Sequence, residues 1–353
     1  MGRRPLSQTA ADRDTAGSRR DDAAAWRPVR DALAGAGWAP VSFEPLAGDV
    51  SARRYARLRL ASGERRIVCS YPADMKDVAA RFVGSTDLLA SVAVPTPRLD
   101  DYSLEPPVWV LQEDLGPRTL YERWIEGGSG AEVDLSRRLA EARELIGRIQ
   151  RLPLDAVRAL GSPPLDGDLL KFELDQTWER FLEPRGLVAD PGLAKQVRSV
   201  CSALCERLDS AARVPCHRDF MARNLMLRAP AAAREVGPEE LVVIDHQDLR
   251  LGPPGYDLAS LLNDTLTLSA RERRRQLPAA YVDSDRMSQY VAATAQRTLK
   301  IVGTFAYFAT VGSDRYLRLI PPALRRFLDA LEALPEGREL APRLREVWAP
   351  VLA

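Results

Sequence analysis

The chain has 353 residues, of which 46% are hydrophobic and 28% are charged, so it can bury a sizeable core without disulfides or a structural metal. Its 50 basic and 49 acidic side chains give a formal net charge of +1, which argues against a nucleic-acid partner because such proteins carry a basic excess. The four cysteines match no zinc-ligand spacing and suit a reducing cytoplasm, and no apolar stretch reaches the ~20 residues of a membrane span. We therefore expect a cytoplasmic protein with no nucleic-acid and no membrane partner.

The first part of the chain is predicted to be a polar tail followed by a sheet-rich lobe. Residues 1–25 contain no apolar core, so we expect a disordered tail and no signal peptide. Polar and apolar side chains alternate over 55–60, and a second strand is predicted over 66–71 after a turn at Gly63. These two strands form a β-hairpin within an N-lobe that we expect to take residues 26–111.

Further along, a helix and a strand are predicted before the sequence becomes mainly helical. The helix covers about 76–89, and the apolar strand covers 108–111. The polar stretch 112–116 is predicted to be a hinge. Beyond it, apolar residues recur at spacings of three and four, which predicts a helical C-lobe over 117–353. The sequence thus predicts an α+β fold with a small sheet-rich N-lobe and a larger helical C-lobe.

The two histidines of the chain lie in two motifs that also carry aspartates. His217, Arg218 and Asp219, with Asn224 further on, match the H-R-D-x-x-x-x-N catalytic loop of phosphoryl-transfer enzymes. In that chemistry an aspartate accepts the proton of the acceptor hydroxyl, while a carboxamide and a second aspartate bind a magnesium ion. Asp245 follows an apolar strand and fits the second aspartate. Each motif alone also arises by chance or as a turn residue, but their order and spacing favour the catalytic interpretation.

Three residues near these motifs are given supporting roles. We expect Asp257 to anchor the catalytic loop by hydrogen bonds and His217 to brace it. Asp248 either contacts the substrate or has a structural role, and the sequence leaves both open.

Together these motifs resemble those of the aminoglycoside phosphotransferase-like kinase family, over about residues 40–330. The closer resemblance is to the branch of sugar kinases that phosphorylate the anomeric hydroxyl of N-acetylmuramate and N-acetylglucosamine during cell-wall recycling. It rests on three stretches: GDVSARRY at 48–55, HQD and GPPGYDLASLL within 246–262, and QRTLKIVGTF at 296–305.

The resemblance implies a two-lobed protein-kinase-like fold and a reaction that uses ATP and Mg²⁺. It implies that Asp219 is the catalytic base and that Asn224 and Asp245 hold the magnesium ion. The loop 48–54 is implied to cover the ATP phosphates, and the backbone of the 112–115 segment is implied to meet adenine. The nucleotide-binding residues that follow from the resemblance are Gly48, Asp49, Ser51, Arg53, Arg54, Gln112, Glu113 and Leu115.

One feature of such kinases is missing. They usually pair a lysine on the third strand with a glutamate on the next helix, but residues 67–71 contain no lysine and 76–89 no glutamate. Either the protein is a nucleotide-binding pseudokinase or another cation takes the lysine's place. Arg54, with Arg53 as second candidate, is predicted to be that cation, because alternation places Arg54 on the inward side of its strand with Ala56. The alternative is that both arginines are solvated charges.

The expected function is an ATP-dependent small-molecule kinase that transfers the γ-phosphoryl group to a sugar hydroxyl, with the anomeric hydroxyl of N-acetylmuramate or N-acetylglucosamine preferred. The alternatives are an aminoglycoside or other small-alcohol phosphotransferase, and a non-catalytic nucleotide-binding pseudokinase. A protein kinase is disfavoured because the chain has no G-x-G-x-x-G loop and His-Gln follows Asp245, where protein kinases have Phe-Gly. We expect a small sugar or alcohol as the substrate and no protein partner.

Overall fold

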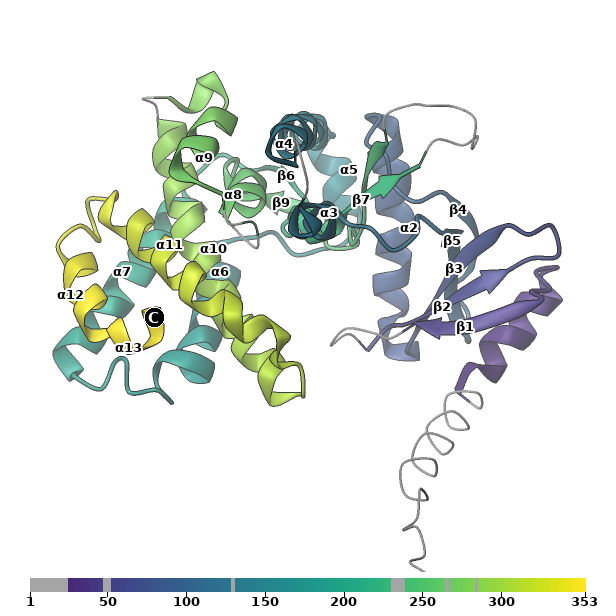
Figure 1. The fold of residues 1–353 in the computed structure, drawn as a ribbon, viewed down its shortest axis with the longest axis horizontal. Helices are drawn as coiled ribbons and strands as arrows, with labels where there is room; N and C mark the ends of the chain where they lie inside the picture. Colours follow the sequence, from purple (N-terminus) through teal and green to yellow (C-terminus); the bar gives the residue numbers. More distant parts are fainter. Residues whose placement is uncertain are drawn as a thin grey trace, which may run out of the picture. The chain divides into compact units, whose positions relative to one another are not determined.

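A computed structural model of the protein describes residues 25–46, 52–127, 131–229, 239–263, 266, 268–282 and 285–353. The chain divides into two compact units (Figure 1). Unit 1 takes Arg98–Asp114 and the described residues up to Ala80, and unit 2 takes Arg81–Pro97 and the described residues from Leu115 onward. The boundary after Asp114 falls within the 112–116 segment that was predicted to be the hinge. Of the predicted tail, only Ala25 lies within the described residues; it is helical, as are residues 26–35.

Unit 1 is built on one antiparallel sheet of five strands. The strands are β1 (Ser42–Leu46), β2 (Arg54–Arg59), β3 (Arg65–Tyr71), β4 (Leu99–Ser103) and β5 (Val108–Glu113). Their order is β1-β2-β3-β5-β4, and β2 pairs with β3 as the predicted hairpin. Alternation along β2 buries Ala56 and Leu58 on one face, where they pack with Val68 of β3 against Trp26 of the helix over 25–35.

Unit 2 is mainly helical. The α-helices are α2 (Lys76–Ser91, whose first residues belong to unit 1), α3 (Leu120–Glu126), α4 (Ala131–Ile149), α5 (Leu154–Ala159), α6 (Gly167–Thr177), α7 (Pro191–Asp209), α8 (Tyr256–Asn263), α9 (Ala270–Gln276), α10 (Asp285–Thr310), α11 (Ile320–Glu332), α12 (Leu340–Val347) and α13 (Ala349–Leu352). Shorter 3-10 or π turns are η1 (Ala73–Met75), η2 (Trp178–Leu182), η3 (Ala222–Asn224), η4 (Ala279–Tyr281) and η5 (Asp314–Leu319).

Side-chain caps begin several of these helices. Asp166 and Asp190 accept hydrogen bonds from backbone N–H groups in the first turns of α6 and α7, and Thr119 and Glu122 cap α3 reciprocally. Helix α10 packs against α6, α7, α8 and α11 (Figure 1). Because most of its side chains are buried, α10 forms the centre of the core of unit 2.

Two small two-stranded sheets in unit 2 hold the two predicted motifs. β6 (Val214–Cys216) pairs with β9 (Arg250–Gly252), and β7 (Leu225–Arg228) pairs with β8 (Glu240–Val243). The catalytic segment, His217–Asn224, connects β6 to β7, and residues 244–249, which include Asp245, connect β8 to β9. Each motif is therefore fixed by a strand at both ends.

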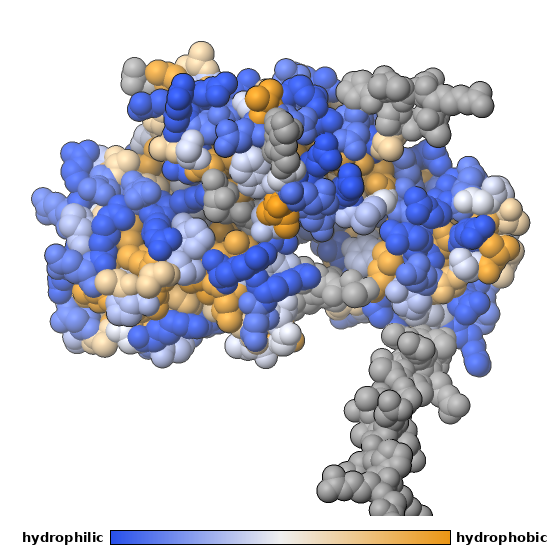
Figure 2. All heavy atoms as spheres, in the orientation of Figure 1, coloured by the Kyte–Doolittle hydropathy of each residue, from blue (hydrophilic) through white to orange (hydrophobic). Residues whose placement is uncertain are grey.

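The predicted α+β fold class is confirmed, since unit 1 carries the five-stranded sheet and unit 2 is predominantly helical. In the view of Figure 2, hydrophilic side chains cover most of the visible face of each unit, and apolar side chains lie there in small separate groups. Across the described ranges, no helix combines the length and the apolar character needed to cross a bilayer.

Candidate active site

The catalytic segment is anchored by Asp257, a buried residue at the start of α8. One carboxylate oxygen of Asp257 accepts a hydrogen bond from the backbone N–H of His217 at 2.8 Å, and the other accepts one from the N–H of Arg218 at 2.9 Å. The thiol of Cys216 donates to the same carboxylate at 3.1 Å. Burial raises the pKa of Asp257, while His217 and these hydrogen bonds oppose the rise. The anchoring role predicted for Asp257 is confirmed.

His217 braces the segment against the strand that leads to Asp245. Its imidazole is fully buried, and Nε2 lies 3.1 Å from the backbone carbonyl oxygen of Ile244, so that Nε2–H donates to this oxygen. The ring also meets the ring of Phe220 edge-on, with centroids 5.6 Å apart. The predicted bracing role is confirmed, and the contact ties the catalytic segment to the residue directly before Asp245.

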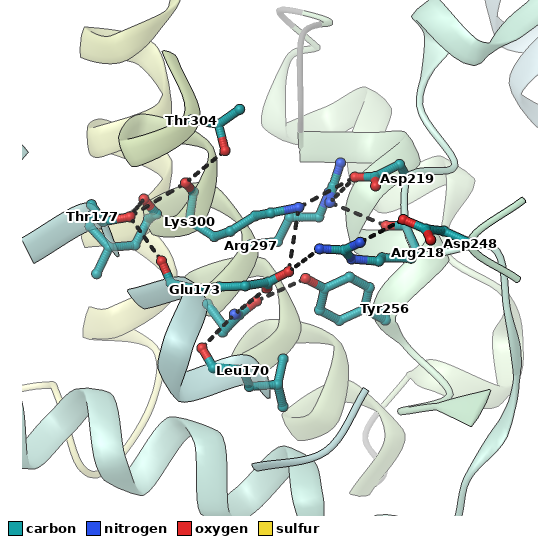
Figure 3. Close-up of polar contacts among 12 residues, drawn as sticks. Leu170, Glu173, Thr177, Arg218, Asp219, Asp248, Tyr256, Arg297, Lys300 and Thr304 are labelled. Atoms are coloured by element: carbon teal, nitrogen blue, oxygen red, sulfur yellow. Dashed lines mark hydrogen bonds and ion pairs between the residues drawn. The ribbon is translucent and has the colours of Figure 1, made fainter. Parts of the chain in front are cut away.

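Asp219, the predicted base, lies against two cations that α10 presents on one face (Figure 3). Its Oδ1 is 2.9 Å from Nη1 of Arg297 and 3.4 Å from Nζ of Lys300. Burial raises the pKa of Asp219, but the positive charges of Lys300, Arg297 and Arg218 outweigh it and hold the pKa well below its ordinary value. The carboxylate therefore stays ionised near neutral pH and is a weak proton acceptor.

A buried carboxylate from another helix completes this site. Glu173, on α6, is 6% exposed, and its Oε1 lies 2.6 Å from Nη2 of Arg218 and 3.7 Å from Nζ of Lys300. Its Oε2 accepts a hydrogen bond from the side-chain amide of Gln296 at 3.1 Å. Burial opposes the ionisation of Glu173, but Lys300 and Arg218 outweigh it and lower the pKa of Glu173.

Arg218 joins the catalytic segment to Glu173 from a strained backbone position. Its φ is 75°, in the left-handed region that non-glycine residues rarely adopt. Its guanidinium donates to Glu173 at 2.6 Å and to Asp248 at 2.8 Å, and Asp248 also pairs with Arg250 at 3.1 Å. Asp248 therefore has a structural contact. The strained Arg218 directly precedes Asp219, and backbone strain of this kind is common at functional sites.

We call this group of charged residues the charge cluster; its members are Glu173, Arg218, Asp219, Asp248, Arg250, Arg297 and Lys300. When all are ionised, four cations face three carboxylates, which leaves a net charge of +1. Sequence motifs do not identify Glu173, Arg297 or Lys300. Two features of the sequence could have pointed to Lys300. It is one of only four lysines among 50 basic residues, and it shares the 296–305 stretch with Arg297.

Asn224 and Asp245, the predicted magnesium ligands, lie at adjoining ends of β7 and β8. The amide nitrogen of Asn224 donates to the backbone carbonyl of Asp219 at 2.9 Å, and its backbone carbonyl accepts from the N–H of Ile244 at 3.0 Å. Asp245 has a φ of 62° and accepts a hydrogen bond from Gln247 at 2.8 Å. A carboxylate and an amide oxygen fit Mg²⁺, which takes few protein ligands when nucleotide phosphates complete its shell. Within the described part of the chain, no three His, Cys, Asp or Glu side chains gather to hold a metal by themselves.

The predicted nucleotide loop is only partly covered: Gly48, Asp49 and Ser51 lie outside the described residues. The two candidate arginines that are described contact different aromatic side chains. Arg54 donates from Nη2 to the backbone carbonyl of Ala25 at 3.0 Å, and its guanidinium lies 5.0 Å from the ring centroid of Trp26. The guanidinium of Arg53 lies 6.0 Å from the ring centroid of Tyr55. A phosphate contact by either arginine stays a prediction.

The predicted hinge begins on β5, whose last two residues are Gln112 and Glu113, and Leu115 is assigned to unit 2. Between them, Asp114 has a side chain that is 1% exposed, and it forms a two-point ion pair with Arg57 of β2. The distances from Nε and Nη2 of Arg57 to the two carboxylate oxygens are 2.7 and 3.3 Å. This pair fixes the end of β5, and the contact of the hinge backbone with adenine stays a prediction.

Solved structures that match the chain are protein-kinase-like phosphotransferases. The GDP complex of aminoglycoside 2'-phosphotransferase-IIIa matches with a TM-score of 0.57 and 14% identity, over 82% of this chain and 92% of that one. An ethanolamine kinase of Plasmodium vivax matches with a TM-score of 0.54 and 13% identity, over 85% and 84% of the two chains. At these identities the likeness shows the fold alone, and it confirms the predicted two-lobed protein-kinase-like fold.

The phosphotransferase enzyme family has a model that matches residues 42–290, and the chain belongs to this family. A curated relative in Pseudomonas aeruginosa, named N-acetylmuramate/N-acetylglucosamine kinase, is 27% identical over 328 residues, which cover 87% of this chain and 90% of the relative. A relative of the same name in Neisseria meningitidis is 28% identical over 315 residues, covering 84% and 86%. The family resemblance and the phosphotransferase activity predicted from the sequence are confirmed.

Proposed function

We propose that this phosphotransferase uses ATP and Mg²⁺ to phosphorylate the anomeric hydroxyl of an N-acetylated amino sugar, N-acetylmuramate or N-acetylglucosamine. The shared name of four curated relatives supports the sugar. A GDP complex and an ATP complex among the structural neighbours support a nucleotide as the phosphoryl donor. With these substrates, the reaction belongs to cell-wall recycling in the cytoplasm.

The observation that carries this proposal is the contact of two cations with the base. An aminoglycoside brings several ammonium groups, and Arg297 and Lys300, at 2.9 and 3.4 Å from Asp219, repel such groups from the hydroxyl to be phosphorylated. In an N-acetylated amino sugar the amine charge is gone, and N-acetylmuramate also carries a carboxylate. The net positive charge of the charge cluster therefore favours a neutral or anionic acceptor.

The low pKa of Asp219 supports the anomeric hydroxyl over an ordinary alcohol. The anomeric carbon also bears the ring oxygen, which withdraws electrons and makes this hydroxyl the most acidic of the sugar. In the proposed step its oxygen attacks the γ-phosphorus and its proton passes to Asp219. The bond from the γ-phosphorus to the bridging oxygen breaks, and ADP leaves with the electron pair. A weak base suffices for the more acidic hydroxyl.

Asn224 and Asp245 are the residues that we propose to hold magnesium. When bound, the ion neutralises charge on the nucleotide phosphates. The pairing of β7 with β8 and the hydrogen bond from the N–H of Ile244 to the carbonyl of Asn224 support this, because they link the backbone of Asn224 to the residue directly before Asp245. The presence of both ligands together with Asp219 argues against the non-catalytic pseudokinase, which needs neither a base nor a full set of metal ligands.

The test is a turnover assay over a panel of acceptors, with the position of the phosphate read by ³¹P NMR. We expect ADP release with N-acetylmuramate and N-acetylglucosamine, coupling of the product phosphorus to the anomeric proton, and no turnover after EDTA removes magnesium. The matched controls are the methyl glycosides of both sugars, whose anomeric hydroxyl is blocked, and we expect no turnover of them. Phosphorylation of the methyl glycosides, or faster turnover of kanamycin than of either sugar, would contradict the proposal.

A further inference from the structure

We propose that Lys300 is a catalytic residue whose ammonium group binds the γ-phosphoryl group while it is being transferred. The inference rests on the proposed phosphoryl transfer with Asp219 as the base. The other three lysines of the chain, Lys76, Lys171 and Lys195, are exposed. The side chain of Lys300 is 12% exposed and reaches the site from α10. A buried ammonium group loses hydration, so its position beside the base calls for partners of opposite charge.

Lys300 lies beside the base. Its Nζ is 3.4 Å from Oδ1 of Asp219 and 3.7 Å from Oε1 of Glu173, so an acceptor hydroxyl bound near Oδ1 would lie next to the ammonium group. Figure 3 shows the side chain extended toward Asp219. The hydroxyls of Thr177 and Thr304 both donate to the backbone carbonyl of Lys300, at 3.4 Å each, which fixes α10 where it carries this side chain.

The neighbouring cations are committed to other contacts. The side chain of Arg297 is 2% exposed, and its Nη1 is shared between Asp219 at 2.9 Å and the backbone carbonyl of Arg218 at 3.2 Å. Arg297 is therefore a positioning residue for the base. The guanidinium of Arg218 is held by two carboxylates at 2.6 and 2.8 Å. Arg223, the other arginine of the catalytic segment, stacks on Tyr121 at 3.9 Å from the ring centroid.

As the transfer proceeds, Asp219 takes up a proton and no longer offsets the charge of Lys300. The ammonium group then becomes more available to the phosphoryl group. Before transfer, the ionised Asp219 offsets part of the charge of Lys300. As the acceptor oxygen attacks the γ-phosphorus, its proton passes to Asp219, the bond from phosphorus to the bridging oxygen breaks, and ADP takes the electron pair. The ammonium group of Lys300 is then drawn to the phosphoryl oxygens. A contact that strengthens during transfer accelerates the reaction rather than merely tightening binding.

The experiment compares Lys300→Met and Lys300→Arg with the wild type and with Lys171→Met, a matched control on α6 whose exposed ammonium group pairs with Asp175. With both substrates saturating, we expect Lys300→Met to lower kcat by about 10²–10³-fold, the typical effect of removing one donor to developing negative charge. The Kd for ATP should change by less than about threefold. Lys300→Arg should recover part of kcat because it restores the charge with a different geometry, and Lys171→Met should match the wild type.

Thermal unfolding separates a loss of chemistry from a loss of fold, and Lys300→Gln is the second neutral variant, measured in place of Lys300→Met if that variant unfolds. A kcat of the neutral variant within about threefold of wild type, while Asp219→Asn shows its expected large loss of kcat, would overturn the role of Lys300. A weaker affinity for either substrate with unchanged kcat would also overturn it. If the wild type turns over no sugar, the proposed function fails, and the same variants are then compared through ATP hydrolysis with water as the acceptor.

Discussion

The two units of the molecule use their cations differently. In unit 1, Arg54 donates to a backbone carbonyl of the helix over 25–35, and Arg57 forms a two-point ion pair with the buried Asp114. In unit 2, two cations of α10 converge on Asp219 instead. We infer that the helices around the base supply the charge for phosphoryl transfer, whereas the arginines of unit 1 serve its architecture and, at most, the binding of the nucleotide.

The largest effect is expected from the proposed metal site in unit 2. Asp245→Ala should abolish turnover and the magnesium dependence of ATP binding, because Asp245 is the carboxylate that we propose for the ion. Titration calorimetry with ATP, in the presence and absence of Mg²⁺, measures the dependence, and Asp175→Ala, which removes the partner of Lys171, is the control. ATP binding by Asp245→Ala with the wild-type dependence on magnesium would show that the ligand is wrongly assigned.

A smaller effect, on stability, tests whether the charge cluster holds unit 2 together. Glu173→Gln keeps the shape of the side chain but removes the charge between Arg218 and Lys300, so we expect the free energy of unfolding to fall by about 3 kcal/mol near neutral pH. Glu179→Gln, at an exposed position on the following turn, should change it little. Urea unfolding of both variants measures the difference.

The pH dependence of that difference has a fixed sign. The pKa of Glu173 is lowered from 4.5, so its charge stabilises the fold fully above that value and progressively less as the pH falls below it. The gap between wild type and Glu173→Gln should therefore shrink at about pH 3.5 relative to neutral pH. A gap of the same size at both pH values would mean that the effect comes from packing and not from charge.

The smallest effects are expected from the arginines of unit 1. Arg53→Ala should raise the KM for ATP more than Arg54→Ala, because Arg54 is engaged with Ala25 and Trp26. Arg54→Ala should instead lower the free energy of unfolding by about 0.5–1 kcal/mol, the typical strength of an exposed cation–π contact. Steady-state kinetics with varied ATP and saturating sugar measure the KM for ATP of both variants. A larger rise of KM in Arg54→Ala would assign the phosphate contact to Arg54.

Local patterns made part of this site predictable. Asp219 and Asn224 belong to one segment, and Asp245 lies two residues beyond β8, the strand that pairs with β7 beside it, so motif and strand pattern together point to all three. Glu173 and Lys300 carry no such signal, because they lie 45 positions from Arg218 and 81 positions from Asp219. Only the packing of α6 and α10 brings them to the catalytic segment. The hairpin of unit 1 is formed by neighbouring segments and could be predicted. The central place of α10 in the core depends on helices far apart in the sequence and could not.

The central claim is that Asp219 and Lys300 act as one unit, and a double-mutant cycle on kcat tests it most directly. Asp219→Asn alone should lower kcat by about 10²–10⁴-fold, and Lys300→Met alone by about 10²–10³-fold. In the double variant we predict a loss close to that of Asp219→Asn alone, because the ammonium group gains its advantage only when the base takes the proton. Losses that multiply in the double variant would show two independent residues and would contradict the claim.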